Sequence, residues 1–330
     1  MTGAAALWWG VSFVSVVVLL VDWPHAPIDV TMHVGFLLIT LFMGPVGVVL
    51  YLLTAREPLP GMHRAYIAAR WKQVVGSTFH CVAGDSVGIV GAAVMASVVR
   101  VTMVWGILIE YAAGFLVGWL IFQSLFMKDM VGGAYGKAVR AMFFPEWLSM
   151  NGVMTGMAVV MVVWMHVHPS AGVPARPEFW FMMAMALIAG AIVAYPLNWW
   201  LVAHGLKHGL MSTAPEPPAE ESVRRSPHAP GVAHGHAAGH TGSVSVSTVQ
   251  TLPVAAVSLV LLLGALWDAV WVYPRPADQV RRGRLAPWGT TSFCPWPSPD
   301  KPNRVVPWRG LEGPSQGGGG RRRLRTEVPP

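Results

Sequence analysis

The chain has 330 residues, of which 54% are hydrophobic and only 12% are charged, and its mean hydropathy is +0.49. This composition excludes a water-soluble domain and indicates an integral membrane protein. The formal net charge of +7 arises in the last 57 residues, because residues 1–273 hold twelve Lys and Arg against twelve Asp and Glu. We therefore expect the lipid bilayer as the main partner and no nucleic acid.

A helix needs about 20 mostly apolar residues to cross the roughly 30 Å of hydrocarbon in a bilayer. Seven stretches meet this requirement: Ala4–Val21, Val34–Leu53, Ser77–Val99, Val101–Met127, Met150–Val167, Phe179–Val202 and Leu252–Val272. The first has no Lys or Arg before its apolar core and no cleavage site after it, so we expect it to stay as an anchor. The sequence thus predicts an all-α, polytopic bundle of about seven transmembrane helices.

Basic residues indicate the orientation, since short loops rich in Lys and Arg stay in the cytoplasm. The loops after the second, fourth and sixth stretches are the basic ones, with Arg56, Arg64, Arg70, Lys72, Lys128, Lys137, Arg140, Lys207, Arg224 and Arg225. We expect a bacterial cytoplasmic membrane protein whose N-terminus is cytoplasmic. The C-terminal tail then lies outside although it carries eleven Lys and Arg, which disagrees with the same rule.

The chain divides into five parts by composition. These are two N-terminal transmembrane helices with a cytoplasmic loop (1–69), a four-span core (70–211), a His-rich flexible linker (212–251), a seventh transmembrane helix (252–273) and a disordered basic tail (274–330). The linker holds His228, His234, His236 and His240, and such a flexible tract binds metal ions loosely. The alternative is a polar linker whose histidines bind nothing specific.

The stretch Gly76–Gly91 has the composition of a membrane-spanning helix, yet it contains a histidine, a cysteine and an aspartate. On a helix of 3.6 residues per turn, His80 shares a stripe with two glycines, and Cys81 and Asp85 occupy the adjacent stripe. Glycines at this spacing let a neighbouring helix approach closely, so we expect this half of the helix to face protein. His80 and Cys81 are candidate metal ligands, and the alternative is that both are structural.

Glu110 stands in the middle of a second glycine stripe, in the fourth stretch, at a depth of about 13 Å for a rise of 1.5 Å per residue. An ionised side chain there costs roughly 2.5 to 3.5 kcal/mol unless it is protonated, paired or hydrated. The third and fourth stretches are joined by a short connection, so we expect antiparallel neighbours in which Asp85 and Glu110 can meet. This depth favours a functional site; the alternative is a hydrogen-bonded contact between helices.

The sixth stretch ends in polar residues. Pro196 frees a backbone carbonyl, and Asn198 follows it with both a donor and an acceptor. His204 and His208 are one helical turn apart and are candidates for sharing a metal ion, but a surface pair flanking Lys207 is the simpler interpretation. The fifth stretch adds methionines at helical spacing, which suit either a soft metal such as Cu(I) or the filling of gaps between helices.

Four segments carry a family resemblance: FHCVAGD at Phe79–Asp85, EYAAGFLVGWLIFQ at Glu110–Gln123, FWFMMAMALIAG at Phe179–Gly190 and YPLNWWLVAHGLKHG at Tyr195–Gly209. They are similar to the bacterial membrane proteins grouped as domain of unknown function family 4396. The resemblance covers roughly Arg70–Met211, and its most specific part is the proline-asparagine motif with the Gly205, Lys207 and His208 that follow. It implies a helical membrane unit followed by a His-rich linker and one further span, and it implies no particular activity.

The sequence predicts that the chain binds or transports a small cation. Copper, as Cu(I), or another soft metal comes first, and protons come second, with Asp85, Glu110 and Asn198 as the polar residues inside the membrane. The alternative is a structural or accessory subunit, in a homo-oligomer or beside a membrane partner protein, whose polar residues only hold helices together. No nucleophile, phosphate-loop or dinucleotide motif is present, so the sequence gives little support to an enzyme.

Overall fold

The computed structural model of the chain describes residues 2–58, 62–99, 101–128, 133–210 and 248–272. The long helices in these residues are α1 (Thr2–Asp22), α2 (Val30–Met43), α3 (Pro45–Thr54), α5 (Arg70–Val99), α6 (Met103–Leu116), α8 (Tyr135–Val167), α9 (Pro177–Ala203) and α11 (Thr248–Val272). Shorter helical segments are η1 (Trp23–His25), α4 (His63–Ile67), η2 (Val117–Gln123), α7 (Ser124–Met127) and η3 (Pro169–Gly172). The predicted all-α class is confirmed. The linker histidines and the tail predicted from residue 274 lie outside the described residues.

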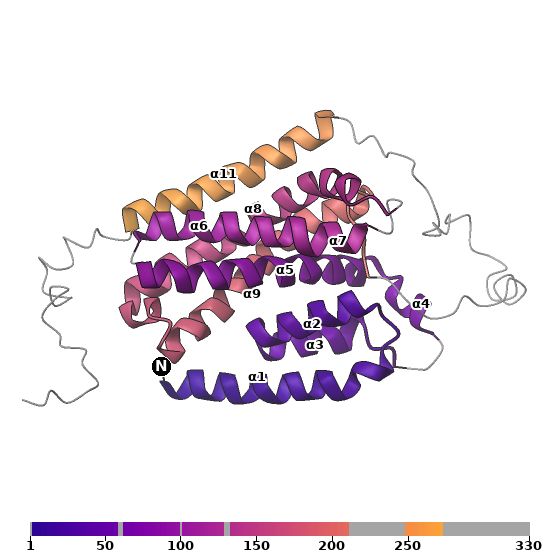
Figure 1. The fold of residues 1–330 in the computed structure, drawn as a ribbon, viewed down its shortest axis with the longest axis horizontal. Coiled ribbons are helices and arrows are strands. Elements are labelled where there is room, and N and C mark those ends of the chain that lie inside the picture. Colours follow the sequence, from indigo (N-terminus) through magenta and orange to yellow (C-terminus); the bar gives the residue numbers. More distant parts are fainter. Residues whose placement is uncertain (1, 59–61, 100, 129–132, 211–247, 273–330) are drawn as a thin grey trace, which may run out of the picture. The chain divides into compact units, whose positions relative to one another are not determined.

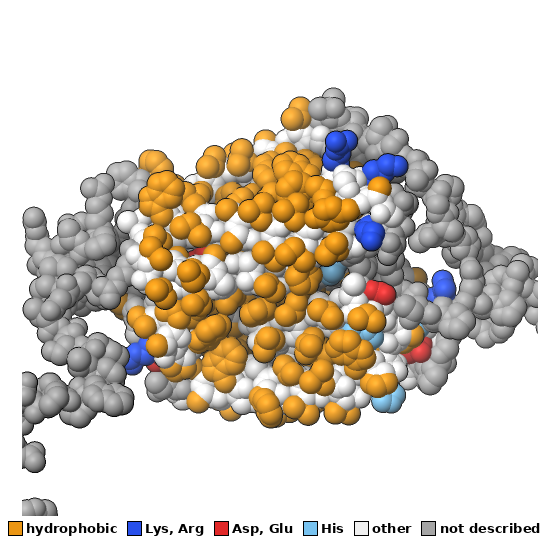
Figure 2. Space-filling model, viewed as in Figure 1, with side chains coloured by type: hydrophobic (Ala, Val, Ile, Leu, Met, Phe, Trp, Pro, Cys, Tyr) orange, Lys and Arg blue, Asp and Glu red, His pale blue; other side chains and the backbone are white. Residues whose placement is uncertain are grey.

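Six segments of the described chain are helices long and apolar enough to cross a membrane: Gly3–His25, Arg70–Val99, Met103–Gln123, Tyr135–Val167, Pro177–Ala203 and Thr251–Ala269. Figure 1 shows them side by side as a bundle, in which α8 is the most enclosed and packs against α9 and α11. Hydrophobic side chains cover the middle of the face in Figure 2, and most of its Lys and Arg lie at one end. Such a surface requires a lipid environment, which confirms a helical membrane protein.

Small residues let the central helices approach closely. A Cβ on Gly88 of α5 would lie 2.6 Å from the carbonyl carbon of Ala113 in α6. A Cβ on Gly152 of α8 would lie 2.8 Å from the Cα of Ala194 in α9. Because only glycine fits such contacts, the backbones touch, as they do in small-residue interfaces between membrane helices. The glycine-rich half of α5 therefore faces protein, as its spacing predicts.

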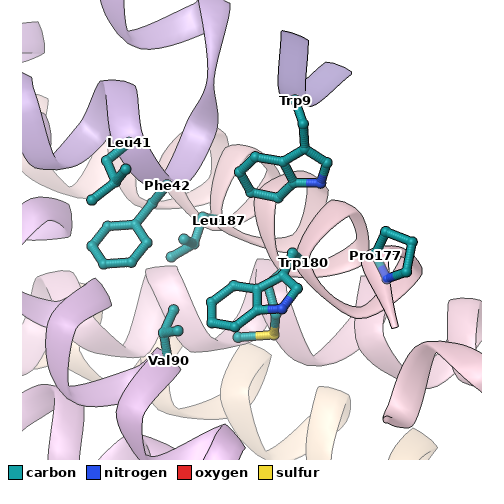
Figure 3. A pocket seen from close by; sticks show the side chains of 8 residues that line it. Trp9, Leu41, Phe42, Val90, Pro177, Trp180 and Leu187 are labelled. Atoms are coloured by element: carbon teal, nitrogen blue, oxygen red, sulfur yellow. The ribbon is translucent and has the colours of Figure 1, made fainter. Parts of the chain in front are cut away.

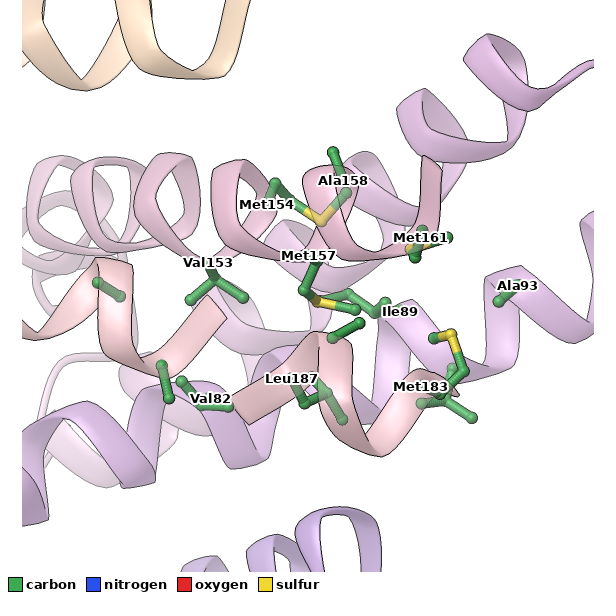
Figure 4. Close-up of a cluster of buried hydrophobic side chains, with 14 of the residues drawn as sticks. Val82, Ile89, Ala93, Val153, Met154, Met157, Ala158, Met161, Met183 and Leu187 are labelled. Carbon is green, nitrogen blue, oxygen red and sulfur yellow. The ribbon is translucent and has the colours of Figure 1, made fainter. Parts of the chain in front are cut away.

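The methionines of α8 lie in the hydrophobic core. Met154 and Met157 are fully buried and Met161 is 3% exposed. Figure 4 shows them beside Ile89 of α5 and Met183 of α9, which belong to the same buried cluster. Flexible thioether side chains fill irregular space between helices, so this packing accounts for the methionine pattern without a metal.

The second predicted span, Val34–Leu53, consists of two helices instead of one. α2 ends at Met43, Gly44 has φ of +61°, and Pro45 begins α3. Glycine adopts this φ without strain, and proline is favoured at the first position of a new helix. Hydropathy does not register one residue that reverses the chain, and this is why the sequence predicted a single straight span.

α2 and α3 fold back on each other as a hairpin. A Cβ on Gly47 of α3 would lie 2.6 Å from backbone atoms of Thr40 in α2. Beyond the hairpin, Arg56 pairs with Asp22 at the end of α1, with 3.0 Å between Nε and Oδ1. The hydroxyl of Tyr51 donates to Oδ2 of the same aspartate at 2.9 Å. The end of α1 and the end of α3 therefore lie together.

The tip of the hairpin lies about half-way along α1. A Cβ on Gly44 would lie 3.0 Å from the indole ring of Trp8 and would also collide with the hydroxyl of Ser12. Ser12 precedes Asp22 by ten residues, or about 15 Å, which is half of a hydrocarbon core about 30 Å thick. The hairpin thus reaches mid-membrane depth and returns to the end of the bundle from which it came.

Candidate functional site: a buried acidic cluster

Three acidic side chains meet in the interior of the bundle. Cys81 and Asp85 come from α5, Glu146 comes from α8, and all three are fully buried. The Cys81 thiol donates to Glu146 Oε2 over 2.9 Å, and Cys81 Sγ lies 3.8 Å from Asp85 Oδ2. One sulfur and two carboxylate oxygens thus lie within 4.8 Å of one another. We call these three residues the acidic cluster.

Helix geometry brings the cluster together. Cys81 and Asp85 are four residues apart, so they share one face of α5. Glu146 reaches them because α8 begins at Tyr135, fifteen residues before the predicted start of this span at Met150. The extra turns of α8 carry a carboxylate into the bundle from a segment that hydropathy alone places in a loop.

A glycine on the neighbouring span leaves room for the two carboxylates. η2, which continues α6, is π-helical, and π-helical turns in α-helices are frequent at functional sites. A Cβ on Gly118 of η2 would lie 2.6 Å from Glu146 Oε1 and would collide with Asp85 Oδ1. Any larger residue would therefore push at least one carboxylate out of the cluster.

Lys207 brings a positive charge to the cluster. After α9 the chain reverses at Gly205, which has φ of +67°, and the N–H of Leu206 donates to the carbonyl of Leu201 at 2.9 Å. This glycine-dependent helix ending turns the following residue back toward the bundle. Lys207 Nζ consequently lies 3.6 Å from Glu146 Oε2, and both side chains are buried.

The charge of Lys207 depends on its acidic neighbours. Burial lowers the pKa of Lys207, but the acidic groups of Cys81, Glu146 and Asp85 together raise it by more, so its pKa lies above the ordinary value. Lys207 therefore stays protonated and neutralises one negative charge of the cluster. Removing one partner of a buried pair leaves the other charge uncompensated, at a cost of about 3–5 kcal/mol.

Two neutral side chains link Lys207 to the cluster. Asn198 of α9 accepts a hydrogen bond from Lys207 Nζ at 2.9 Å and donates one to Ser149 Oγ at 2.9 Å. Ser149 Oγ in turn lies 3.2 Å from Cys81 Sγ. The network therefore runs from α9 through α8 to α5, and it fixes the orientation of the cluster from three helices.

Two oxygens of the cluster lack hydrogen bonds. Asp85 Oδ1 and Glu146 Oε1 are buried, and neither has a partner among the described residues. A buried carboxylate oxygen without a donor is costly, and a proton or a metal ion would satisfy it. Both oxygens approach Gly118, so they open toward one common space.

A small cavity lies beside Lys207. Its volume is about 10 Å³, room for about one water molecule. It is lined by Met32, Ser77, His80, Gln123, Met142, Lys207, His208 and Gly209. Ser77 Oγ and Gln123 Nε2 are buried without a hydrogen-bond partner in the described part of the chain, so the lining suits a water molecule. Because Lys207 touches both the cavity and the acidic cluster, it stands between them.

The structure brings three of the predicted site residues into one network: Cys81, Asp85 and Asn198. Glu110 is also buried, but it lies outside the group of residues within 4.8 Å, and Glu146 takes the place expected for it beside Asp85. Glu110 Oε2 has no hydrogen-bond partner among the described residues.

The predicted histidine ligands do not join the acidic cluster. His80 Nδ1 would lie 3.5 Å from a Cβ on Gly35 of α2, so the ring faces the hairpin. His204 donates from Nδ1 to the carbonyl of Trp200 at 2.8 Å, and His208 lines the small cavity. The linker residues His228, His234, His236 and His240 lie outside the described residues, so their metal binding stays a prediction.

Sequence reasoning missed Glu146 and Lys207. Glu146 has a signal in PEWLS, since a carboxylate followed three residues later by Ser149 puts two polar groups on one helical face. For Lys207 the sequence signal is the preceding Gly205, because a glycine just after a helix commonly reverses the chain. Neither signal identifies the partner, because 65 residues separate Cys81 from Glu146.

Residues 70–207 match the family model described as Domain of unknown function (DUF4396). The match spans the acidic cluster, Lys207 and Asn198, and it ends before the His-rich linker. Comparisons with curated proteins and with solved structures found no match.

Proposed function

We propose that this chain, which belongs to the DUF4396 family through residues 70–207, binds a small cation at the acidic cluster inside the membrane. One observation carries the proposal: a thiol and two carboxylates lie within 4.8 Å of one another, fully buried, with two carboxylate oxygens unsatisfied by the described residues. Three acids in a low-dielectric interior need positive charge, and Lys207 supplies only one.

The donor set favours a borderline divalent metal ion over Cu(I). Zinc binds thiolate sulfur and carboxylate oxygen together, whereas Cu(I) selects sulfur ligands. The cluster offers one sulfur, and the nearby methionines of α8 are occupied in the core. With Cys81, Asp85 and Glu146 ionised, three negative charges and the one positive charge of Lys207 leave a balance of −2, which a divalent cation neutralises. We therefore take Zn²⁺ as the leading cation in place of copper.

A proton is the second candidate. The 2.9 Å contact between Cys81 Sγ and Glu146 Oε2 is a hydrogen bond between two acids, so one proton is shared there. Lys207 and the small cavity then provide a short hydrated step toward the end of the bundle. In the absence of a metal ion, the same residues would exchange protons with that end.

The orientation of the bundle follows from the basic loops. Because α5, α6, α8 and α9 alternate in direction, the segments that hold Arg64, Lys137 and Lys207 share one end. The hairpin returns Arg56 to the position of Asp22, so α1 alone joins that end to the N-terminus. With the basic loops in the cytoplasm, we propose that the N-terminus lies outside, in a bacterial cytoplasmic membrane, in place of the cytoplasmic N-terminus expected for a straight second span. The acidic cluster then lies nearer to the cytoplasmic end of the bundle.

The proposal is tested by measuring how much zinc binds to the purified full-length protein. The linker contributes no ligand in this test because its histidines are changed to alanine at His228, His234, His236 and His240. We expect about one Zn²⁺ per chain by elemental mass spectrometry and a measurable affinity by competition with a chelator. Cys81→Ser and Glu146→Gln should each weaken zinc binding by more than about 100-fold, since even substitutions beyond the direct ligands cost about 10- to 100-fold.

Matched substitutions separate a site from general damage. Cys294→Ser removes the other cysteine, and Glu178→Gln removes another buried carboxylate. Both should keep the zinc. Retention of zinc in Cys81→Ser and Glu146→Gln would refute the metal site. Absence of zinc, combined with proton uptake that Glu146→Gln abolishes, would favour the proton candidate; absence of both would leave a structural or accessory role.

A further inference from the structure

An apolar cavity of about 440 Å³ lies beyond the tip of the α2–α3 hairpin. Figure 3 shows Leu41 and Phe42 at the tip, facing Trp9 of α1, Val90 of α5 and Trp180 of α9. None of the described side chains that line the cavity is charged, and the indole N–H of Trp180 is already donated to the carbonyl of Pro174 at 2.9 Å. Its volume falls in the range of small-molecule sites, about 300–1,000 Å³.

The cavity exists because the hairpin is short. Gly44 at the tip packs against the middle of α1, so α2 and α3 fill only the half of the membrane next to the basic loops. In the other half, α1 meets α9 directly, with the rings of Trp8 and Phe181 5.7 Å apart, and the cavity lies beside this contact. α9 begins on that side at Pro177, since its other end leads to Lys207. The cavity therefore extends from mid-membrane depth toward the membrane face opposite the basic loops.

The surroundings of the cavity select its occupant. Water does not fill a cavity with an apolar lining, and an empty cavity of this size would destabilise the core around it. At this depth in the membrane, the protein is surrounded by lipid acyl chains, which are available to fill the cavity. At the mouth, the exposed Arg176 precedes the lining residue Pro177 and carries a positive charge suited to a phosphate. The neighbouring carboxylate of Glu178 is buried and does not line the cavity.

We propose that this cavity binds one acyl chain of an anionic phospholipid from the leaflet opposite the basic loops, with its phosphate paired to Arg176. Trp180 lies in the first turn of α9 at this end of the bundle, and tryptophan is enriched at the boundary between acyl chains and headgroups. The lipid completes the wall that α2 and α3 leave open. The site is separate from the acidic cluster and does not rest on the proposed cation binding.

Native mass spectrometry of the full-length protein in mild detergent tests the lipid site, with phosphatidylglycerol and phosphatidylcholine of equal chain length as probes. We expect the protein to retain one phosphatidylglycerol through delipidation that removes other lipids. Val90→Phe and Leu187→Phe, which fill the cavity, should each abolish retention. Arg176→Gln should remove the preference for phosphatidylglycerol over phosphatidylcholine. Val159→Phe on the exposed face of α8 and Arg140→Gln near the start of α8, at the end with the basic loops, are the matched controls and should change neither result.

Thermal stability gives a second measurement. Phosphatidylglycerol should raise the melting temperature of the parent protein and of Val159→Phe but not of Val90→Phe, and zinc binding should be equal in all three. The proposal is wrong if the filled variants keep the lipid, if the control variants lose it equally, or if the retained mass is a second protein copy or a molecule other than a phospholipid.

Discussion

Gly118 is the residue against which the carboxylates of Asp85 and Glu146 pack. We expect Gly118→Ala to lower the free energy of unfolding by about 1–3 kcal/mol, the usual cost of adding a methyl group to a filled interior. It should also weaken zinc binding, because the new Cβ occupies the space of Asp85 Oδ1. Thermal denaturation in detergent and zinc competition measure the two effects.

Gly91 supplies the matched control on α5. A Cβ there would meet nothing within 4 Å, so Gly91→Ala should leave zinc binding unchanged and add up to about 1 kcal/mol of stability through helix propensity. If Gly118→Ala proves as stable and as competent as Gly91→Ala, the two carboxylates do not lie against η2.

Single residues inside the spans were partly predictable. Cys81 and Asp85 attract notice because a polar group in an apolar stretch is costly, and their shared face follows from helical spacing. The identity of the third residue in the cluster could not be predicted in the same way. Glu110 was expected beside Asp85 because a short connection joins their two spans, but the register of the helices sets Asp85 against Gly118, eight residues beyond Glu110. The structure places Glu146 there, from a helix whose first turns are too polar for a hydropathy window.

Among the helices, the ending of α9 decides where Lys207 points. Gly205 has a positive φ that costs other residues roughly 1–2 kcal/mol, so Gly205→Ala should destabilise the protein by about that amount and withdraw Lys207 from Glu146. Gly205→Asn should cost less, since asparagine tolerates this conformation. In thermal denaturation, we expect the parent protein with Gly205 to melt at the highest temperature, Gly205→Asn at a lower one and Gly205→Ala at the lowest. Equal stability of the two variants would contradict this helix ending.

Among the helices, the sequence predicted where apolar stretches lie better than where a stretch is interrupted. Six of the seven expected spans overlap one long apolar helix each, whereas the stretch at Val34–Leu53 is interrupted at Gly44. Twenty apolar residues satisfy the length of a span whether they run straight or fold back. The contacts that decide for a hairpin, between Arg56 and Asp22 and between Gly44 and Trp8, join separate elements and have no local signature.

Across the whole molecule, polar chemistry and apolar packing are separated along the bundle. The acidic cluster and the water-sized cavity lie toward the end with Lys207, while the methionine-rich core of α8 and α9 follows farther along the same helices. The proposed cation would therefore have the shorter way to the cluster from the end with Lys207. Binding needs only this state, whereas transport needs a second one in which α8 moves relative to α5 or α9 and opens the core.

The hairpin makes a sharp prediction about sidedness. In a Cys294→Ser background, which keeps only the buried native Cys81, a cysteine introduced at the exposed position Gly3 or Met62 should react with a membrane-impermeant maleimide from opposite sides, Gly3→Cys in intact cells and Met62→Cys only after permeabilisation. Ala175→Cys should behave like Gly3→Cys and Lys137→Cys like Met62→Cys, because the alternating helices place them at those ends. Labelling of Gly3→Cys and Met62→Cys from the same side would mean that Val34–Leu53 crosses the membrane once, as its hydropathy suggests, and that α2 and α3 are not a re-entrant hairpin.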